Sequence, residues 1–231
     1  MYSSAWPSRW GLDRVEAVDE IKYLDIETND KIIGQDFDTL ENDPMKCLNG
    51  IAVGDEEDER GTHVIVMKSI SIRGFVAEPR ADGPTPIPHN LVRLSLVLDT
   101  QTNGAQMTGL EPYVDAVTDA QNVNQWRYLE ENSRFKVLTN TLLHIKPQNM
   151  VVPGDIAAIP PVLDTFHCPH TYTPFEIHHD FGGEGKRVLY SGTGNHIGDI
   201  VDNSIHLIGV ALQPSEATIS YTSRLRWINH W

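Results

Sequence analysis

Two histidine-containing segments hold the residues best suited to bind a metal. His167-Cys168-Pro169-His170 offers His167, Cys168 and His170 as ligands that zinc accepts, but the sequence identifies no fourth ligand. His178 and His179 are adjacent, so in a strand they point to opposite faces and cannot share a metal without a bulge. The His-x-His pattern followed by Glu, typical of metal-binding cupins, is absent. We expect no metal site and no cofactor, and His167, Cys168 and His170 remain the candidates.

Motifs for covalent or phosphate chemistry are missing from the sequence. It contains no Gly-x-Ser-x-Gly, Walker loop, dinucleotide fingerprint or His-Glu-x-x-His. The glycine-rich stretches 182–186 and 191–195 open no predicted helix, so we interpret them as turns between strands. Ser, His and Asp are abundant, which leaves an unrecognised triad open. The sequence therefore predicts a protein that is not an enzyme.

The charge of the chain is strongly negative. Asp and Glu total 32 against 18 Lys and Arg, a net charge of −14, and sixteen of the acids lie between Asp13 and Glu59. Such a surface repels phosphate. The run Asp55–Glu59 suits a divalent cation at a subunit interface, but it lacks the spaced ligands of a calcium loop, which favours a solvated loop tip.

No segment is typical of membrane insertion or secretion. Residues 1–7 contain no apolar stretch of a signal peptide, and no apolar run approaches the roughly 20 residues that span a bilayer. Two cysteines give no disulfide framework. We expect a soluble protein with no membrane partner.

The elements that must position these residues are predicted to be strands, because apolar residues alternate with a period of two. The clearest case is Thr218–Trp227, where Ile219, Tyr221, Leu225 and Trp227 share one face. A segment that is apolar on both faces, Ile205–Leu212, predicts a central strand. The remaining predicted strands are Glu20–Glu27, His63–Val76, Leu91–Asp99, Phe135–Ile145, Phe175–Phe181 and Lys186–Tyr190.

Long connections separate these eight strands. They run over 28–61, 79–90, 100–133 and 146–174, and the third has room for helical turns at 111–120 and 124–131. Loops of this length are usually functional or part of an interface. The pattern predicts an all-β fold, a single eight-stranded antiparallel jelly-roll sandwich with long loops and short helical turns. We expect an N-terminal segment over 1–18 and one jelly-roll domain over 19–231.

Three groups of segments resemble the coat proteins of small circular single-stranded DNA viruses, the circovirus-like and geminivirus-like groups. The likeness extends in order from about Glu20 to Trp227. The segments are Leu48–Ala52, Arg60–Thr62 and Met67–Ile70, then Val92–Asp99 with Gln101–Gly104, then Asn132–Leu138.

The resemblance implies a capsid protein whose identical copies assemble into an icosahedral shell around a single-stranded genome, and a place in the virion. It also implies a basic N-terminal arm, and here the sequence departs. Residues 1–18 hold only Arg9 and Arg14 as bases, beside Asp13 and Glu16. This departure puts direct genome binding by the chain in doubt.

Candidate interface and genome-binding residues follow from this interpretation. Tyr2, Trp6, Trp10 and Trp231 lie at the chain ends, where they would anchor a neighbouring subunit or cap the core of their own. The predicted polar strand faces carry Arg73, Arg93, Arg224 and Arg226, which would meet phosphates of single-stranded DNA or pair with acids. The alternative function is a carbohydrate-binding, lectin-like jelly roll, which would need exposed aromatic residues on a sheet face.

Overall fold

The computed structural model describes most of the chain. The described residues are 20–43, 45–78, 90–109, 111–113, 123, 133–145, 149–153, 163–167, 171–212 and 217–230. In the two strands over 149–153 and 163–167 only the backbone is described. The expected N-terminal segment 1–18 lies outside these residues.

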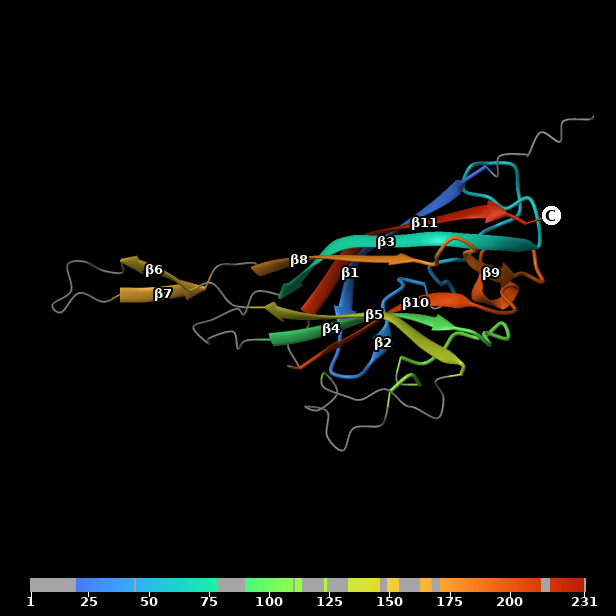
Figure 1. Ribbon diagram of the computed structural model, residues 1–231. Helices are drawn as coiled ribbons and strands as arrows, with labels where there is room; N and C mark the ends of the chain where they lie inside the picture. The colour runs from blue at the N-terminus through green and yellow to red at the C-terminus, as the bar shows by residue number, and fades with distance from the viewer. Residues whose placement is uncertain are drawn as a thin grey trace, which may run out of the picture.

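The first sheet contains the longest strands of the protein. It has the order β1-β11-β3-β8, all antiparallel, and β9 pairs with the N-terminal end of β3 (Figure 1). Its strands are β1 (Lys22–Ile33), β3 (Val64–Glu78), β8 (Thr171–Asp180), β9 (Lys186–Leu189) and β11 (Ala217–Asn229).

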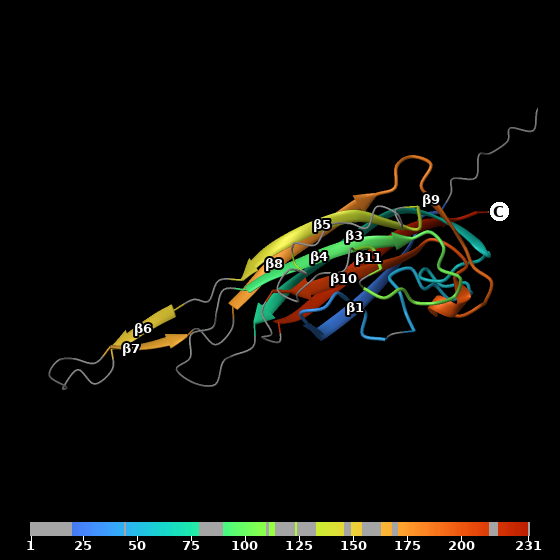
Figure 2. The same ribbon diagram turned by 90° about the horizontal axis from the view of Figure 1, so that it is seen from below.

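The second sheet faces the first and has the order β2-β10-β4-β5, again antiparallel. Its strands are β2 (Asp38–Thr39), β4 (Asn90–Asp99), β5 (Phe135–Ile145) and β10 (Ser204–Ala211). A separate hairpin of β6 (Asn149–Pro153) and β7 (Leu163–His167) projects from the end of the sandwich where β5 ends and β8 begins (Figures 1 and 2). A short 3-10 turn, η2 (Ile197–Asp199), precedes β10.

This strand order is that of a jelly roll. When β6, β7 and β9 are left out and the remaining eight strands are numbered 1 to 8 in chain order, the two sheets have the strand orders 1-8-3-6 and 2-7-4-5. Consecutive strands therefore cross repeatedly from one sheet to the other. The predicted all-β jelly-roll sandwich is confirmed. The long connection expected over 28–61 is shorter than predicted, because β1 continues to Ile33 past an irregularity at Asn29 and Asp30, and β2 follows it. Most of the two expected helical turns lies outside the described residues.

The main core lies between the sheets and contains the inward faces that alternation predicted. On β11 these are Ile219, Tyr221, Leu225 and Trp227, and on β4 Val92, Leu94, Leu96 and Leu98. A second apolar cluster covers the opposite face of the second sheet, with Phe37, Val97, Met107, Tyr113, Val123, Phe135, Ile208 and Val210. Both faces of β4 and β10 are therefore buried, whereas most of the outer face of the first sheet, the open face, is not covered by any described segment.

Candidate functional site

The open face of the first sheet carries three of the four predicted arginines. Arg224 is bidentate to Asp25 across the β1–β11 pair, at 2.7 Å from Nε to Oδ1 and 2.5 Å from Nη2 to Oδ2. Its guanidinium also lies 5.0 Å from the centre of the Tyr23 ring. The Arg224 hydrogen bond lowers the pKa of the Asp25 carboxyl. Arg224 is thus already paired with a carboxylate.

Arg73 is held in the same way on β3. Its Nε and Nη2 donate to Oε1 of Glu176 on β8, at 2.9 and 2.8 Å. Arg226 is exposed between Tyr23 and Ser69, its register partners, and makes no side-chain hydrogen bond or ion pair with another described residue. Of the two roles considered for these arginines, contact with phosphate or pairing with acids, Arg73 and Arg224 show the pairing with acids.

Arg93 has a different environment from the other three. Alternation placed it correctly on the opposite face from Val92 and Leu94, but that face is covered, and Arg93 is only 7% exposed. Its Nε donates to Asn140 Oδ1 at 3.0 Å, and its guanidinium lies 4.6 Å from the centre of the Tyr113 ring. The expected open polar face at Arg93 is wrong, because residues remote in sequence close over it.

One end of the open face is apolar rather than charged. The apolar patch consists of Ile32, Phe75, Ala77, Tyr172 and Pro174, which the strand register brings into two adjacent rows across the sheet. Tyr172 is 55% and Ile32 52% exposed. Phe75 and Tyr172 meet edge to face, with ring centroids 5.1 Å apart. Sequence alternation alone does not predict this exposed patch, because Phe75 and Tyr172 resemble aromatic residues of a core.

A small groove separates the charged part of this face from the apolar patch. Its volume is about 190 Å³, and Glu27, Asn29, Arg73, Phe75, Ser220 and Thr222 are among its lining residues. Hydrogen-bonding side chains beside an aromatic ring are groups that can bind a polar ligand.

The histidine candidates are only partly within the described residues. Cys168 and His170 lie outside them, and His167 ends β7 opposite Asn149. His178 and His179 point to opposite faces as predicted: His178 Nδ1 is 2.9 Å from Ser71 Oγ on the open face, and His179 packs edge to face on Phe181. Among the described residues, no group of three or more His, Cys, Asp or Glu side chains is arranged to hold a metal.

The remaining predictions concern the chain ends and the acidic loop. Tyr2, Trp6, Trp10 and Trp231 all lie outside the described residues. The loop over 55–59 folds against the edge of the first sheet, where the Lys22 ammonium donates to the carbonyls of Glu56 and Glu59 at 2.9 and 3.0 Å. Tyr23 donates to Glu57 Oε2 at 2.8 Å. The Lys22 ammonium therefore occupies two backbone carbonyls of this loop.

A buried arrangement that resembles a triad was missed in the sequence. Ser204 Oγ is 2.9 Å from His206 Nε2, and His206 Nδ1 is 3.8 Å from Glu41 Oε1. All three side chains are buried, so the serine hydroxyl is not accessible to a substrate.

No helix within the described residues is long and apolar enough to cross a membrane.

Comparisons with known proteins give a weak structural likeness. No protein-family model matches the chain, and no curated protein is similar to it. Among solved structures, the crystal structure of the 60-mer BFDV capsid protein is similar at 13% identity and a TM-score of 0.27. The alignment covers 91% of this chain and 93% of that one.

Proposed function

We propose that this chain is a viral coat protein whose identical copies assemble into a closed icosahedral shell around a single-stranded genome. Its place would be the virion, and the host cell during assembly. The observation that carries the proposal is a complete jelly roll with an exposed apolar patch on the open face of one sheet. Exposed apolar patches on a sheet face are typical of surfaces that bind another protein.

Local charge supports a second copy of the chain as the partner of this patch. The chain as a whole is strongly acidic, so most pairs of surfaces on two copies repel each other. The open face carries only a small part of that charge, since Arg73, Arg224 and Arg226 partly offset the acids Asp25, Glu27, Asp30, Glu176 and Asp180. Two of these arginines are already paired with carboxylates. A contact between copies at this face therefore meets less charge repulsion than a contact at the more acidic parts of the surface.

The pairing of Arg73 and Arg224 with acids limits which arginines on this face can bind a phosphate of the genome. A phosphate would have to displace Glu176 from Arg73 or Asp25 from Arg224, whereas Arg226 needs no such exchange. On this face, Arg226 is therefore the arginine that we propose to contact a phosphate.

Serine at both Phe75 and Tyr172 should prevent particle formation without unfolding the subunit. Both side chains are more than a third exposed in the subunit, so serine there should cost a modest amount of stability, mainly the edge-to-face ring pair, while it removes apolar area from the proposed contact. We expect uniform closed particles from the wild type and small oligomers from F75S/Y172S, by size-exclusion chromatography and negative-stain microscopy. Thermal unfolding should show a cooperative transition for both subunits, with a slightly lower midpoint for the variant.

The matched control is L142S, which removes an exposed leucine from the second sheet instead. Particles from L142S but not from F75S/Y172S support the patch as the contact. Particles from F75S/Y172S contradict that role alone. A wild-type chain that stays monomeric at every concentration and salt tested contradicts the proposed function.

Particle yield should rise with ionic strength. With a charge of −14 per subunit, approaching copies repel each other, and salt shortens the range of that repulsion. The screening length is about 30 Å at 0.01 M salt and about 8 Å at 0.15 M, so most of the gain should occur between these conditions. Light scattering across a salt series measures the yield, with magnesium chloride at equal ionic strength testing for a divalent cation at interfaces. A yield that does not change with salt contradicts this prediction.

One observation favours the lectin-like alternative. The groove beside Phe75, with Arg73, Asn29 and Glu27 in its lining, combines an aromatic ring with hydrogen-bonding side chains, as sugar sites do. A glycan that binds the wild type but not an N29A variant, with no particles under any condition, would favour this function over the shell.

A further inference from the structure

Glu41 and His206 form a buried pair in which each side chain has an atom without a hydrogen-bond partner. Glu41 follows β2, His206 lies on β10, and Glu41 Oε1 is 3.8 Å from His206 Nδ1. Neither Glu41 Oε2 nor His206 Nδ1 makes a hydrogen bond with a described residue. Leaving such atoms unpaired in the interior is costly, and here the two unpaired atoms belong to neighbouring groups.

Glu41 completes the edge of the second sheet beyond the short strand β2. Its Oε1 accepts the Leu207 amide at 3.1 Å, and the Leu40 amide donates to the Leu207 carbonyl at 2.8 Å. Further along β10, Asn49 Oδ1 accepts the Ile205 amide at 2.8 Å. Backbone and side-chain groups of residues 40–49 thus take the place of a neighbouring strand, and the side chains of Glu41 and Asn49 cover backbone donors that would otherwise be free at a sheet edge.

The other ring nitrogen of His206 is fixed by hydroxyl groups. Nε2 is 2.9 Å from Ser204 Oγ, which is 2.8 Å from Thr102 Oγ1. A hydroxyl can accept the Nε2 proton, which leaves Nδ1 as the acceptor of a neutral imidazole. A carboxylic acid at Glu41 is the donor that Nδ1 lacks.

Burial decides the charge of the pair. The charged and titratable groups that act on Glu41 are Lys31 on β1, Asp38 on β2, Cys47 in the following loop and Tyr221 on β11, and Asp99 on β4 acts on His206. No ion pair other than that with His206 reaches Glu41 from the described residues. Desolvation raises the pKa of Glu41 to about 8 and lowers the pKa of His206 to about 4, so both groups are neutral between these values.

We propose that Glu41 and His206 share one proton, carried by Glu41 Oε2 and donated to His206 Nδ1, and that this proton locks residues 40–49 onto β10. Glu41 Oε1 is 3.8 Å from His206 Nδ1, so the carboxyl has to turn to bring Oε2 within hydrogen-bond range of Nδ1. Loss of the proton leaves a buried carboxylate beside a neutral imidazole, and residues 40–49 then separate from β10 to hydrate it. The inference concerns the single subunit and does not depend on the shell.

The proposal fixes how stability changes with pH. The pKa of Glu41 is higher in the folded protein than its ordinary value of 4.5, so its contribution is full below that value and is lost as the pH rises through about 8. The pKa of His206 is lower than its ordinary 6.5, so its contribution is full above that value and is lost as the pH falls through about 4. The contact of residues 40–49 with β10 is therefore weakened both at high pH and at low pH.

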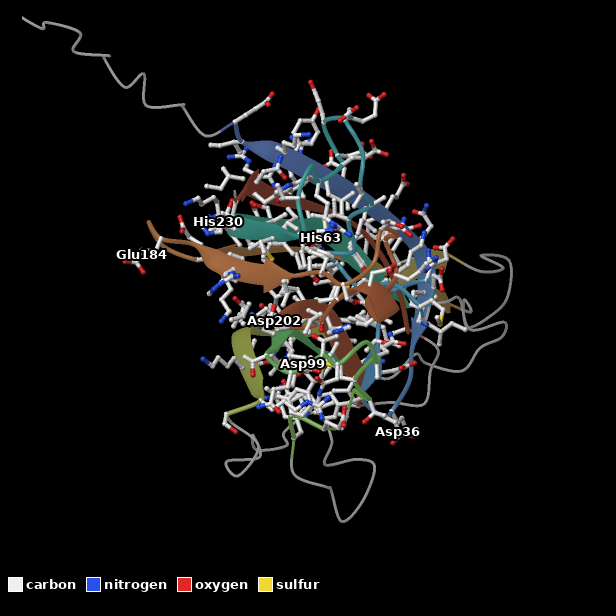
Figure 3. The ribbon with its side chains drawn as sticks, turned by 90° about the vertical axis from the view of Figure 1, so that its right-hand side faces the viewer. Asp36, His63, Asp99, Glu184, Asp202 and His230 are labelled. Atoms are coloured by element: carbon white, nitrogen blue, oxygen red, sulfur yellow. The ribbon has the colours of Figure 1, made fainter. Side chains whose placement is uncertain are left out.

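The test compares urea unfolding of the wild type and Glu41→Gln between pH 5 and pH 9, about the window set by the pKa of Glu41. A glutamine keeps an acceptor for Leu207 and a donor for His206 but cannot ionise. Relative to E41Q, the wild-type folding constant should fall by up to about tenfold per pH unit, which is the linkage for one proton. The control is E184Q, in the exposed turn before β9, where the side chain points away from the protein (Figure 3). E184Q should follow the wild type.

Two results would overturn the proposal. One is an E41Q variant whose stability falls with pH as steeply as that of the wild type. The other is read on the wild type alone, and so applies even where E41Q does not fold: infrared spectra in D₂O at neutral pH without the band of a protonated carboxyl group. A protonated-carboxyl band that disappears as the pH rises above about 8, together with loss of amide-exchange protection at Ile205 and Leu207, supports it.

Discussion

Replacing Arg60 with methionine should lower the free energy of unfolding by about 3 kcal/mol, one of the two largest effects that we expect. Arg60 is completely buried, and its guanidinium donates to three backbone carbonyls, those of Ile51, Thr62 and Gly192. It also lies over the Tyr190 ring, 4.2 Å from the centroid. Methionine fills part of the volume but donates nothing, so three carbonyls in two loops lose their donor together.

Lysine at the same position separates charge from geometry. R60K keeps a positive charge, but its single ammonium cannot stack on Tyr190 or reach three carbonyls that are arranged around a planar fork. We expect R60K to be destabilised nearly as much as R60M, as measured by urea unfolding followed by tryptophan fluorescence. An R60M variant within about 0.5 kcal/mol of the wild type, the usual range for a neutral surface change, would contradict this role.

Much of the fold could be predicted because inward and outward residues alternate. In β11 the inward face reads directly from the sequence, and β10, apolar on both faces, is central as expected. The β6–β7 hairpin was missed, since each strand has only five residues and lies within a long connection. The continuation of β1 was missed because Asn29 and Asp30 resemble a turn. Asp30 instead has φ of 51° at a register shift, and the strand resumes beyond it.

The candidate site was harder to predict, because it depends on which sheet face is covered. Nothing local to Arg93 shows that Tyr113 and Val123 close over it. The available signal was indirect: Val97, Ile208 and Val210 make the same face of β4 and β10 apolar, which would be unusual for an open face. The first sheet lacks that signal, because the outward residues of β11 from Thr218 to Arg226 are polar.

The segments that resemble viral coat proteins include residues that hold loops in place. Asn49 and Arg60 organise the connection between β2 and β3, and Thr102 binds Ser204, the first residue of β10. Asp99 and Arg134, from two separate segments, are in contact. Figure 3 shows Asp99 at the end of the second sheet, away from His63 and His230 on the first. These motif residues therefore act on the fold, whereas the proposed contact between copies lies on residues outside the motifs.

Replacing Arg134 with leucine should destabilise the protein by about 3 kcal/mol, because it leaves a buried carboxylate without its counter-ion. Asp99 is fully buried and accepts Nε and Nη2 of Arg134 at 3.1 Å each, and Arg134 is 28% exposed. Its guanidinium also lies 4.4 Å from the centre of the Phe135 ring. Leucine keeps apolar contact with that ring, so the loss should come mainly from the unpaired charge.

A double-mutant cycle isolates this charge from the packing of the arginine. D99N removes the negative charge and keeps an oxygen that can accept the Gln101 amide, which now donates to Asp99 Oδ1 at 2.9 Å. In the D99N/R134L background the uncompensated carboxylate is gone, so the double variant should be more stable than R134L alone by at least about 1 kcal/mol. Urea unfolding of the four proteins gives the coupling energy. Effects of the two substitutions that simply add would mean that Asp99 does not depend on Arg134, and that the junction of β4 and β5 is held by the remaining hydrogen bonds from Thr100 to the carbonyls of Ser133 and Arg134.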